Sequence, residues 1–231
     1  TIGSSGQTLS LGSDSNSLDG NDTLSGSNAA ITGNITTGSG ADSLTLTSGS
    51  SIAGNVSLGT AGDSTNGNAD TLSLNASTIT GNVTTGSGAD TVTLTNTSTI
   101  TGNVTLGSNT DSTDGNDSLS VSGASGSSLS VITGSISTGA GADSVSFTDA
   151  TIGSSGQTLS LGSDSNSLDG NDTLSGSNAA ITANVTTGSG ADSLTLTTGS
   201  SIAGNVSLGI DGDTTNGNAD SLSLKIGRAH V

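Results

Sequence analysis

The chain has 231 residues and a formal net charge of −17, and all 19 of its acidic residues are aspartate. Its only Lys, Arg and His residues are Lys225, Arg228 and His230, and it contains no Cys, Pro, Met, Trp or Tyr. This composition excludes a basic nucleic-acid groove before Lys225, a Cys- or His-based zinc site or nucleophile–base pair, and an apolar run of membrane-spanning length.

The sequence is a long repeat. Residues 1–32 are identical to residues 151–182, and the same offset of 150 residues relates "SIAGNVSLG" at 51–59 to its copy at 201–209. We therefore interpret residues 1–224 as one continuous array with a 150-residue super-repeat, 1–150 and 151–224. Repeats of this kind are typical of solenoids, in which each unit packs only against its neighbours.

A shorter period lies inside the super-repeat. A leading isoleucine recurs at Ile2, Ile31, Ile52, Ile79, Ile100, Ile132, Ile152, Ile181 and Ile202. Units of 20 or 21 residues therefore alternate with units of 27 to 32 residues. The extra residues fall mostly in one place, between the "GNV" segment and the next alternating segment, which is how a solenoid accepts insertions without changing its stacked strands.

Alternating apolar and polar residues indicate the strands. In "TVTLT" (91–95), Val92 and Leu94 point to one side and the threonines point to the other, which predicts a half-buried strand. In "ITGNV" (79–83), the apolar Ile79 and Val83 are expected on one face. The pattern predicts an all-β, right-handed parallel β-helix or β-roll of about eight coils of 20–32 residues, with two or three short strands per coil and no helix. At roughly 4.8 Å per coil, it is about 40 Å long.

An asparagine recurs in the "GN" pair of most units. Stacked amides can hydrogen-bond along the rod, and asparagine also suits left-handed turn positions, so we expect a structural asparagine ladder. Its members are Asn34, Asn55, Asn82, Asn103, Asn184 and Asn205.

An aspartate ends the turn before each alternating segment. Two examples are "TGSGADTVT" at 85–93 and "LDGNDTLSG" at 168–176. Because coils stack, these aspartates are expected to form a second ladder. The residues are Asp22, Asp42, Asp70, Asp90, Asp117, Asp143, Asp172, Asp192 and Asp220.

These turns resemble the bacterial RTX nonapeptide G-G-x-G-x-D-x-U-x, in which U is a large aliphatic residue. Residues 85–93 match it except for Thr85 at the first glycine, and "DGNDTL" at 169–174 has Asp169 in that place. The resemblance implies calcium held between turns of successive coils, in very large secreted or surface proteins. RTX repeats recur every nine residues, whereas here one such turn occurs per coil. The whole chain also resembles the β-strand-repeat passengers of large autotransporters and adhesins.

Electrostatics points to calcium separately. Like charges about 4.8 Å apart repel by roughly 1 kcal/mol in water, and calcium takes carboxylates and carbonyls in flexible loops. Alternatively, each aspartate caps the N–H groups of its own turn and faces screened water. The nine ladder aspartates are candidate calcium ligands, together with Asp114 and Asp169. The long loops are the stronger candidates because they hold additional aspartates, which are Asp111, Asp114, Asp164, Asp169, Asp211 and Asp213.

The predicted function is a non-enzymatic, acidic spacer in a secreted or cell-surface adhesin-like protein of extracellular or bacterial-surface location. Its expected partners are neighbouring repeats of the same parent chain and a host-surface or matrix ligand, with no nucleic acid and no membrane insertion in this segment. One alternative is ice binding, or other surface binding, by rows of outward threonine and serine. A polysaccharide-active β-helix enzyme is a further alternative, although the carboxylates repeat with the coil and no aromatic platform exists to bind a sugar.

The final seven residues, "KIGRAHV", depart from the repeat. Lys225 aligns with Asn75, and the match is lost in the middle of a strand. The heptapeptide is what a common short-read sequencing adapter encodes in one frame, so we interpret residues 225–231 as foreign to the protein. We expect the array to continue in the parent protein beyond residue 224.

Overall fold

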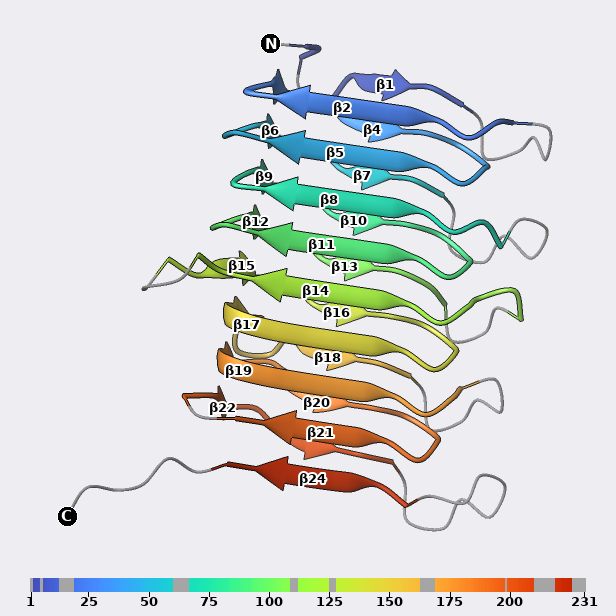
Figure 1. The fold of residues 1–231 in the computed structure, drawn as a ribbon. Coiled ribbons are helices and arrows are strands. Elements are labelled where there is room, and N and C mark those ends of the chain that lie inside the picture. The colour runs from blue at the N-terminus through green and yellow to red at the C-terminus, as the bar shows by residue number, and fades with distance from the viewer. Residues whose placement is uncertain are drawn as a thin grey trace.

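The structure is a computed structural model that describes residues 2–4, 6–12, 19–59, 67–108, 112–124, 128–162, 169–197, 199–209 and 219–225. All regular elements of this part are β-strands, stacked as a single column (Figure 1). Within the same ranges no helix is long and apolar enough to cross a membrane. Asp111, Asp164, Asp211, Asp213 and the tail 226–231 lie outside the described residues.

One side of each coil is a long strand that begins directly after the ladder aspartate. These strands pair in parallel in the order of the chain, and their side chains are in register. They are β2 (Thr23–Ser27), β5 (Ser43–Thr47), β8 (Thr71–Asn75), β11 (Thr91–Thr95), β14 (Ser118–Ser122), β17 (Ser144–Ile152), β19 (Thr173–Ile181), β21 (Ser193–Leu196) and β24 (Ser221–Leu224).

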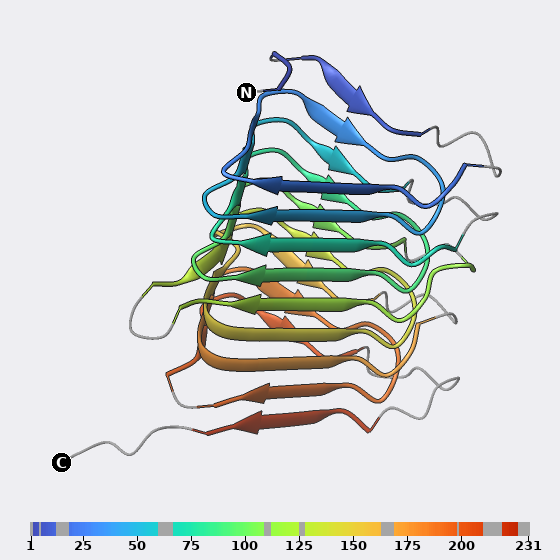
Figure 2. The ribbon, with the colours of Figure 1, turned by 45° about the horizontal axis from the view of Figure 1, so that its top comes forward.

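Two short strands complete most coils, and the tilted view shows that they lie behind the long strands (Figure 2). The first follows the long strand around a corner, and in β17 and β19 the strand continues around that corner without a break. The separate strands at this position are β3 (Ala30–Ile31), β6 (Ser51–Ile52), β9 (Thr78–Ile79), β12 (Thr99–Ile100), β15 (Ser130–Ile132) and β22 (Ser201–Ile202).

The second short strand of each coil belongs to a nine-stranded parallel sheet of its own. Its members are β1 (Thr8–Ser10), β4 (Asn34–Thr36), β7 (Val56–Ser57), β10 (Val83–Thr84), β13 (Val104–Thr105), β16 (Ile136–Ser137), β18 (Thr158–Ser160), β20 (Asn184–Thr186) and β23 (Val206–Ser207). Eight complete coils, from β2 to β23, are thus flanked by β1 and β24. The prediction of an all-β parallel solenoid of about eight coils is confirmed.

The core is one continuous column of aliphatic side chains. In β11, Val92 and Leu94 are fully buried, as the alternation predicts, and Ile79 and Val83 are also buried although they lie on two different short strands. Because a single coil contributes so few apolar side chains, the core exists only through stacking. The single aromatic residue, Phe147, is also part of this column.

The outward face of the long strands carries no charge. In β11 it presents Thr91, Thr93 and Thr95, and the register places a serine, threonine or asparagine beside each of them in β8 and β14. Asp149, at the corner of β17, is the only described aspartate within a long strand, and the other described aspartates lie in the turns. The outward serine and threonine side chains of the long strands therefore form an uncharged surface, called here the hydroxyl face, on a strongly acidic protein.

The asparagine ladder exists, but its bonds differ from the expected amide stack. The Oδ1 of Asn34 accepts the backbone N–H of Asn55 at 2.9 Å, and the Oδ1 of Asn55 accepts that of Asn82 at 2.8 Å. Asn103 bonds in the same way to the N–H of Ser135, because serine replaces asparagine there. Each amide therefore binds the backbone of the following coil.

Candidate metal centre: an aspartate ladder

The structure brings the predicted ladder aspartates into one line, each at the residue before a long strand. In a short turn such as 85–90, "TGSGAD", Gly86 and Gly88 adopt φ values of +119° and +129°, which only glycine adopts readily. These two residues reverse the chain so that Asp90 precedes β11 directly. The same sequence in the turns at 37–42 and 187–192 places Asp42 and Asp192 in the same way.

From Asp42 onward, each ladder carboxylate is hydrogen-bonded to the coil before its own. The Oδ1 of Asp90 accepts the backbone N–H of Asp70 at 2.8 Å, and the Oδ1 of Asp117 accepts that of Asp90 at 2.7 Å. The remaining steps have the same geometry, at 2.7–3.0 Å. They are Asp22 to Asp42, Asp42 to Asp70, Asp117 to Asp143, Asp143 to Asp172, Asp172 to Asp192 and Asp192 to Asp220.

The ladder is buried between its two end members, Asp22 and Asp220, which are more exposed. Asp42 and Asp90 are each 1 % exposed, and Asp117 is 2 % exposed. For the buried members, the alternative prediction, in which each aspartate caps its own turn and faces water, is therefore wrong. The reason is the stacking itself, because the next coil covers each carboxylate and the donor within reach is the N–H of the previous coil.

The second oxygen of most of these carboxylates is buried without a hydrogen-bond partner among the described residues. A carboxyl oxygen that is buried without a partner is costly, because it has lost its hydrogen bonds to water. The atoms are the Oδ2 of Asp22, Asp42, Asp90, Asp117, Asp143 and Asp172.

Three ladder aspartates, each at the end of a long turn (58–70, 106–117 and 161–172), have strongly raised pKa values. Burial is the main cause, and it raises the pKa of Asp70 to about 8, that of Asp117 to about 10 and that of Asp172 to about 9. The N–H that each of them accepts lowers the pKa, while the neighbouring aspartates raise it again by repulsion. At neutral pH these carboxyl groups favour the protonated form.

Two ladder aspartates that end a short turn, Asp90 and Asp143, have pKa values that are raised less. Burial raises the pKa of Asp90 to about 6, and the Asp70 N–H and the nearby Thr85 hydroxyl oppose this shift. Burial also raises the pKa of Asp143 to about 6, opposed by Thr138 and by the Asp117 N–H. Protonated and ionised carboxyl groups therefore alternate over part of the ladder near pH 7, which reduces the repulsion between neighbours.

The two predicted residues of the long turns, Asp114 and Asp169, lie beside the ladder. The Oδ2 of Asp114 accepts the backbone N–H of Ser108 in its own turn and that of Ala140 in the next coil, both at 2.9 Å. Burial raises the pKa of Asp114 to about 7 against the effect of these two donors. Asp169 is 6 % exposed, and its Oδ2 accepts the N–H of Ser189 in the next coil at 2.9 Å.

The donor set fits calcium only in part. The orphaned, buried carboxylate oxygens are of the chemical type that calcium prefers. Across the described ranges, however, no three acidic side chains form a group that could hold a metal ion. Calcium binding by the eleven predicted aspartates therefore stays a prediction.

Sequence reasoning missed two features of this site. The first residue of each short turn is a buried threonine. The hydroxyl groups of Thr37, Thr85 and Thr138 donate to a carbonyl of the next coil, as in Thr85 to Leu106 at 2.9 Å, whereas the Thr187 hydroxyl has no partner among the described residues. The second glycine of the short turn packs against the backbone of the previous coil, so that a Cβ on Gly88 would lie 2.2 Å from the Asn68 carbonyl oxygen. Both residues are part of the recurring motif T-G-x-G-A-D, as its threonine and its second glycine.

The raised pKa values predict that the fold is most stable in acid. Each of these groups has a folded pKa above the unfolded value of 3.8, so its contribution to stability is complete below about pH 4 and is lost as the pH rises through the folded value. We expect the free energy of unfolding, measured by denaturant titration, to fall between pH 4 and pH 10, by about 1.4 kcal/mol per pH unit for each retained proton.

A matched pair of variants separates this effect from general repulsion. Asp117→Asn removes one buried carboxyl group of the ladder, whereas Asp149→Asn makes the same chemical change at a corner outside the ladder. Only Asp117→Asn should reduce the pH dependence. Stability that increases from pH 4 to pH 8, or equal slopes in the two variants, would contradict the prediction.

Comparisons with known proteins identify no relatives. No protein-family model, no curated protein and no solved structure matches this chain. Its function must therefore be argued from the fold and the ladder.

Proposed function

We propose that this chain is a non-catalytic spacer of a secreted or cell-surface, adhesin-like protein. The observation that carries the proposal is the uniform stacking, because two parallel sheets and one core continue from the first coils to the last. Such a column holds whatever is attached to its ends at a fixed separation. A length that grows by the coil, about 4.8 Å each, suits a spacer whose reach is set by repeat number.

The chemistry of the carboxylates supports the same proposal. In an enzyme of the glycosidase type, two carboxylates at one place differ in role. Here every ladder carboxylate does the same thing, which is to accept the N–H of the previous coil. Repetition of one role along the molecule favours a structural purpose over a single reactive centre.

Lengthening the array tests the spacer. Inserting a second copy of residues 1–150, which contains six turns, should increase the maximum dimension in small-angle X-ray scattering by about 29 Å at constant cross-section. A compact particle of unchanged length would refute the proposal. So would hydrolysis of a polysaccharide that is abolished by Asp117→Asn and retained in Asp149→Asn.

Calcium is proposed as a stabiliser of the spacer. The support is the set of orphaned Oδ2 atoms of the ladder, together with the scarcity of cations, since Lys225 is the only Lys, Arg or His among the described residues. Binding to the folded state alone would raise stability by mass action. Adding a chelator at low salt should then lower the melting temperature substantially, and returning calcium, but not the same ionic strength of sodium, should restore it. An unchanged melting curve would exclude calcium.

The hydroxyl face supports ice binding as a second candidate function. Its favouring observation is a regular, uncharged row that includes Thr45, Thr93 and Thr195, which the strand register aligns along the column. The threonine methyl and hydroxyl groups would meet ordered water on a flat surface. Outward threonine is also common on any exposed strand, so the test must be specific for this face.

Charges placed on this row should abolish ice binding. We expect the triple variant Thr45→Lys, Thr93→Lys and Thr195→Lys to lose thermal hysteresis and recrystallisation inhibition. The matched control carries Thr36→Lys, Thr84→Lys and Thr186→Lys, a row on the other sheet. Absence of both activities in the unmodified chain, or their equal loss in both variants, would exclude this function for the hydroxyl face.

A further inference from the structure

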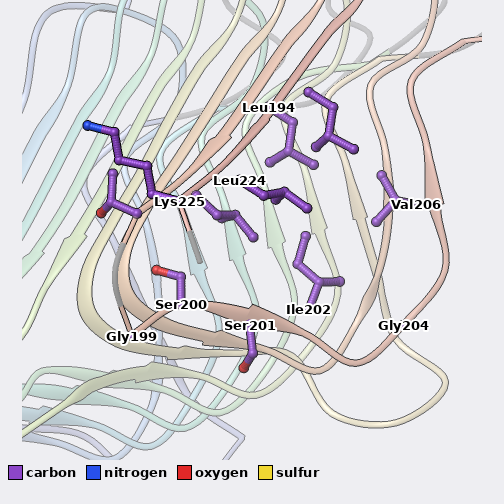
Figure 3. Close-up of a pocket in the computed structure, with 12 residues that line it drawn as sticks. Leu194, Gly199, Ser200, Ser201, Ile202, Gly204, Val206, Leu224 and Lys225 are labelled. Atoms are coloured by element: carbon purple, nitrogen blue, oxygen red, sulfur yellow. The ribbon is translucent and has the colours of Figure 1, made fainter. Parts of the chain in front are cut away.

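The apolar pocket beside β24 is an extension of the core. Figure 3 shows the side chains of Leu194, Ile202, Val206 and Leu224 around it. The strand register places all four at core positions of their coils. β24 is the last described strand, so the pocket is continuous with the core rather than a separate site.

The ladder asparagines all begin the triplet N-x-S/T, which is the acceptor sequence for N-linked sugars. The middle residue of each triplet is valine or isoleucine, and the third is an outward residue of a short strand. Serine and threonine occupy many outward strand positions of this chain, so the triplet needs a second observation. The hydrogen bonds of the side-chain amides provide it.

The ladder bonds use only the oxygen of each amide. The Oδ1 of Asn82 accepts the N–H of Asn103 at 2.8 Å, and the Oδ1 of Asn103 accepts that of Ser135 at 2.9 Å. A Cβ on Gly102 would lie 2.6 Å from the Oδ1 of Asn82, so this oxygen packs closely against the next coil. The Nδ2 atoms of Asn82 and Asn103 have no hydrogen-bond partner among the described residues, and both asparagines are exposed. A sugar on Nδ2 would therefore leave the ladder bond intact.

The hydroxyl group of the triplet is also free at these two sites. Thr84 in β10 and Thr105 in β13 are half-buried outward residues. Their hydroxyl groups have no hydrogen-bond partner in the described part of the chain. The two side chains that define each triplet are thus both available on the same edge of the column.

Five other triplets of this kind lie outside the asparagine ladder, and two of them provide a contrast within the same coils. They begin at Asn75 and Asn96, at the corner after the long strands. The Nδ2 of Asn96 donates to the Oδ1 of Asn75 at 3.0 Å. The hydroxyl groups of the buried Ser77 and Ser98 donate to the carbonyls of Asn75 and Thr95, at 2.9 and 2.6 Å. These two triplets can present their hydroxyl groups only after the corner opens locally.

We propose that the outward edge of the asparagine ladder, at Asn82 and Asn103, is a modification site that accepts N-linked sugars. In the transfer, a bond forms between Nδ2 and the anomeric carbon of a nucleotide-activated sugar. The bond from that carbon to the phosphate breaks, the nucleoside diphosphate leaves, and the amide loses one proton to the solvent.

The ladder spacing limits what the edge can hold. Asparagines of adjacent coils are about 4.8 Å apart, so the edge takes single sugars side by side or larger glycans at intervals. Modification in the parent protein rests on the exported location proposed above, because such acceptors belong to secreted proteins.

Transfer of glucose from UDP-glucose to the intact, folded chain by a soluble N-glycosyltransferase tests the site. The rate at each asparagine is measured by mass spectrometry and divided by the rate for a synthetic peptide that contains the same triplet. This ratio removes the preference of the enzyme for particular sequences. We expect it to be about tenfold or more higher at Asn82 and Asn103 than at Asn75 and Asn96, because the corner must open first. Equal ratios at the four sites, or transfer to the peptides but not to Asn82 and Asn103, would overturn the proposal.

Two substitutions of one threonine provide the matched controls. Thr84→Ala should abolish transfer to Asn82 and leave transfer to Asn103 unchanged, whereas Thr84→Ser should retain both. The glucosylated chain should melt within about 2 °C of the unmodified chain, because each Oδ1 keeps its bond. Transfer to Asn82 in the Thr84→Ala variant, or a larger fall in melting temperature, would contradict the proposal. Neither measurement depends on the length of the column, so the spacer function and this modification can fail separately.

Discussion

The bond from each buried aspartate to the backbone of the preceding coil determines where every turn of this solenoid must end. Because the Oδ1 of one aspartate meets the N–H of the previous one, the last residue of each turn has the same position relative to the column. Extra residues of a turn are then accommodated before that aspartate, and in the longest unit further residues lie between β14 and β15. Units of 20 to 32 residues therefore stack with their strands in register.

The side-chain hydrogen bonds between coils run in two opposite directions along the column. Ladder carboxylates accept from the coil before them, whereas ladder asparagines accept from the coil after them. Each internal coil is consequently held to its two neighbours by side chains at two different corners. The main-chain bonds of the parallel sheets are thus supplemented by directional contacts that an apolar core cannot provide.

Much of this architecture was predictable from the sequence, because period 2 and a recurring isoleucine are direct signs of stacked strands. The alternation of Val92 and Leu94 with threonine predicted β11 and its buried face correctly. Stacking also brought the nine aspartates into a line, as expected. What spacing could not predict is which backbone donor each carboxylate would meet, since Asp42, Asp90 and Asp117 could equally have turned toward their own loops.

The burial of the ladder was unpredictable for a related reason. A charged side chain is normally exposed to water, and the sequence "GAD" does not indicate that the next coil covers the carboxylate. The roles of Thr85 and Gly88 were hidden as well, although their motif was visible, because both act on a neighbouring coil rather than on their own turn. Contacts between repeats are the part of a solenoid that a single repeat cannot reveal.

The alternation of turns has a consequence for how such a gene can change. Unequal recombination between repeats adds or removes whole coils, but a gain or loss of one coil would bring two turns of the same kind together. Only even numbers preserve the pattern, and the 150-residue unit contains three long and three short turns. A protein whose length changes by recombination between near-identical DNA repeats would therefore keep this alternation by gaining or losing coils in pairs. Residues 1–32 recur at 151–182, and this offset of six turns is an even number.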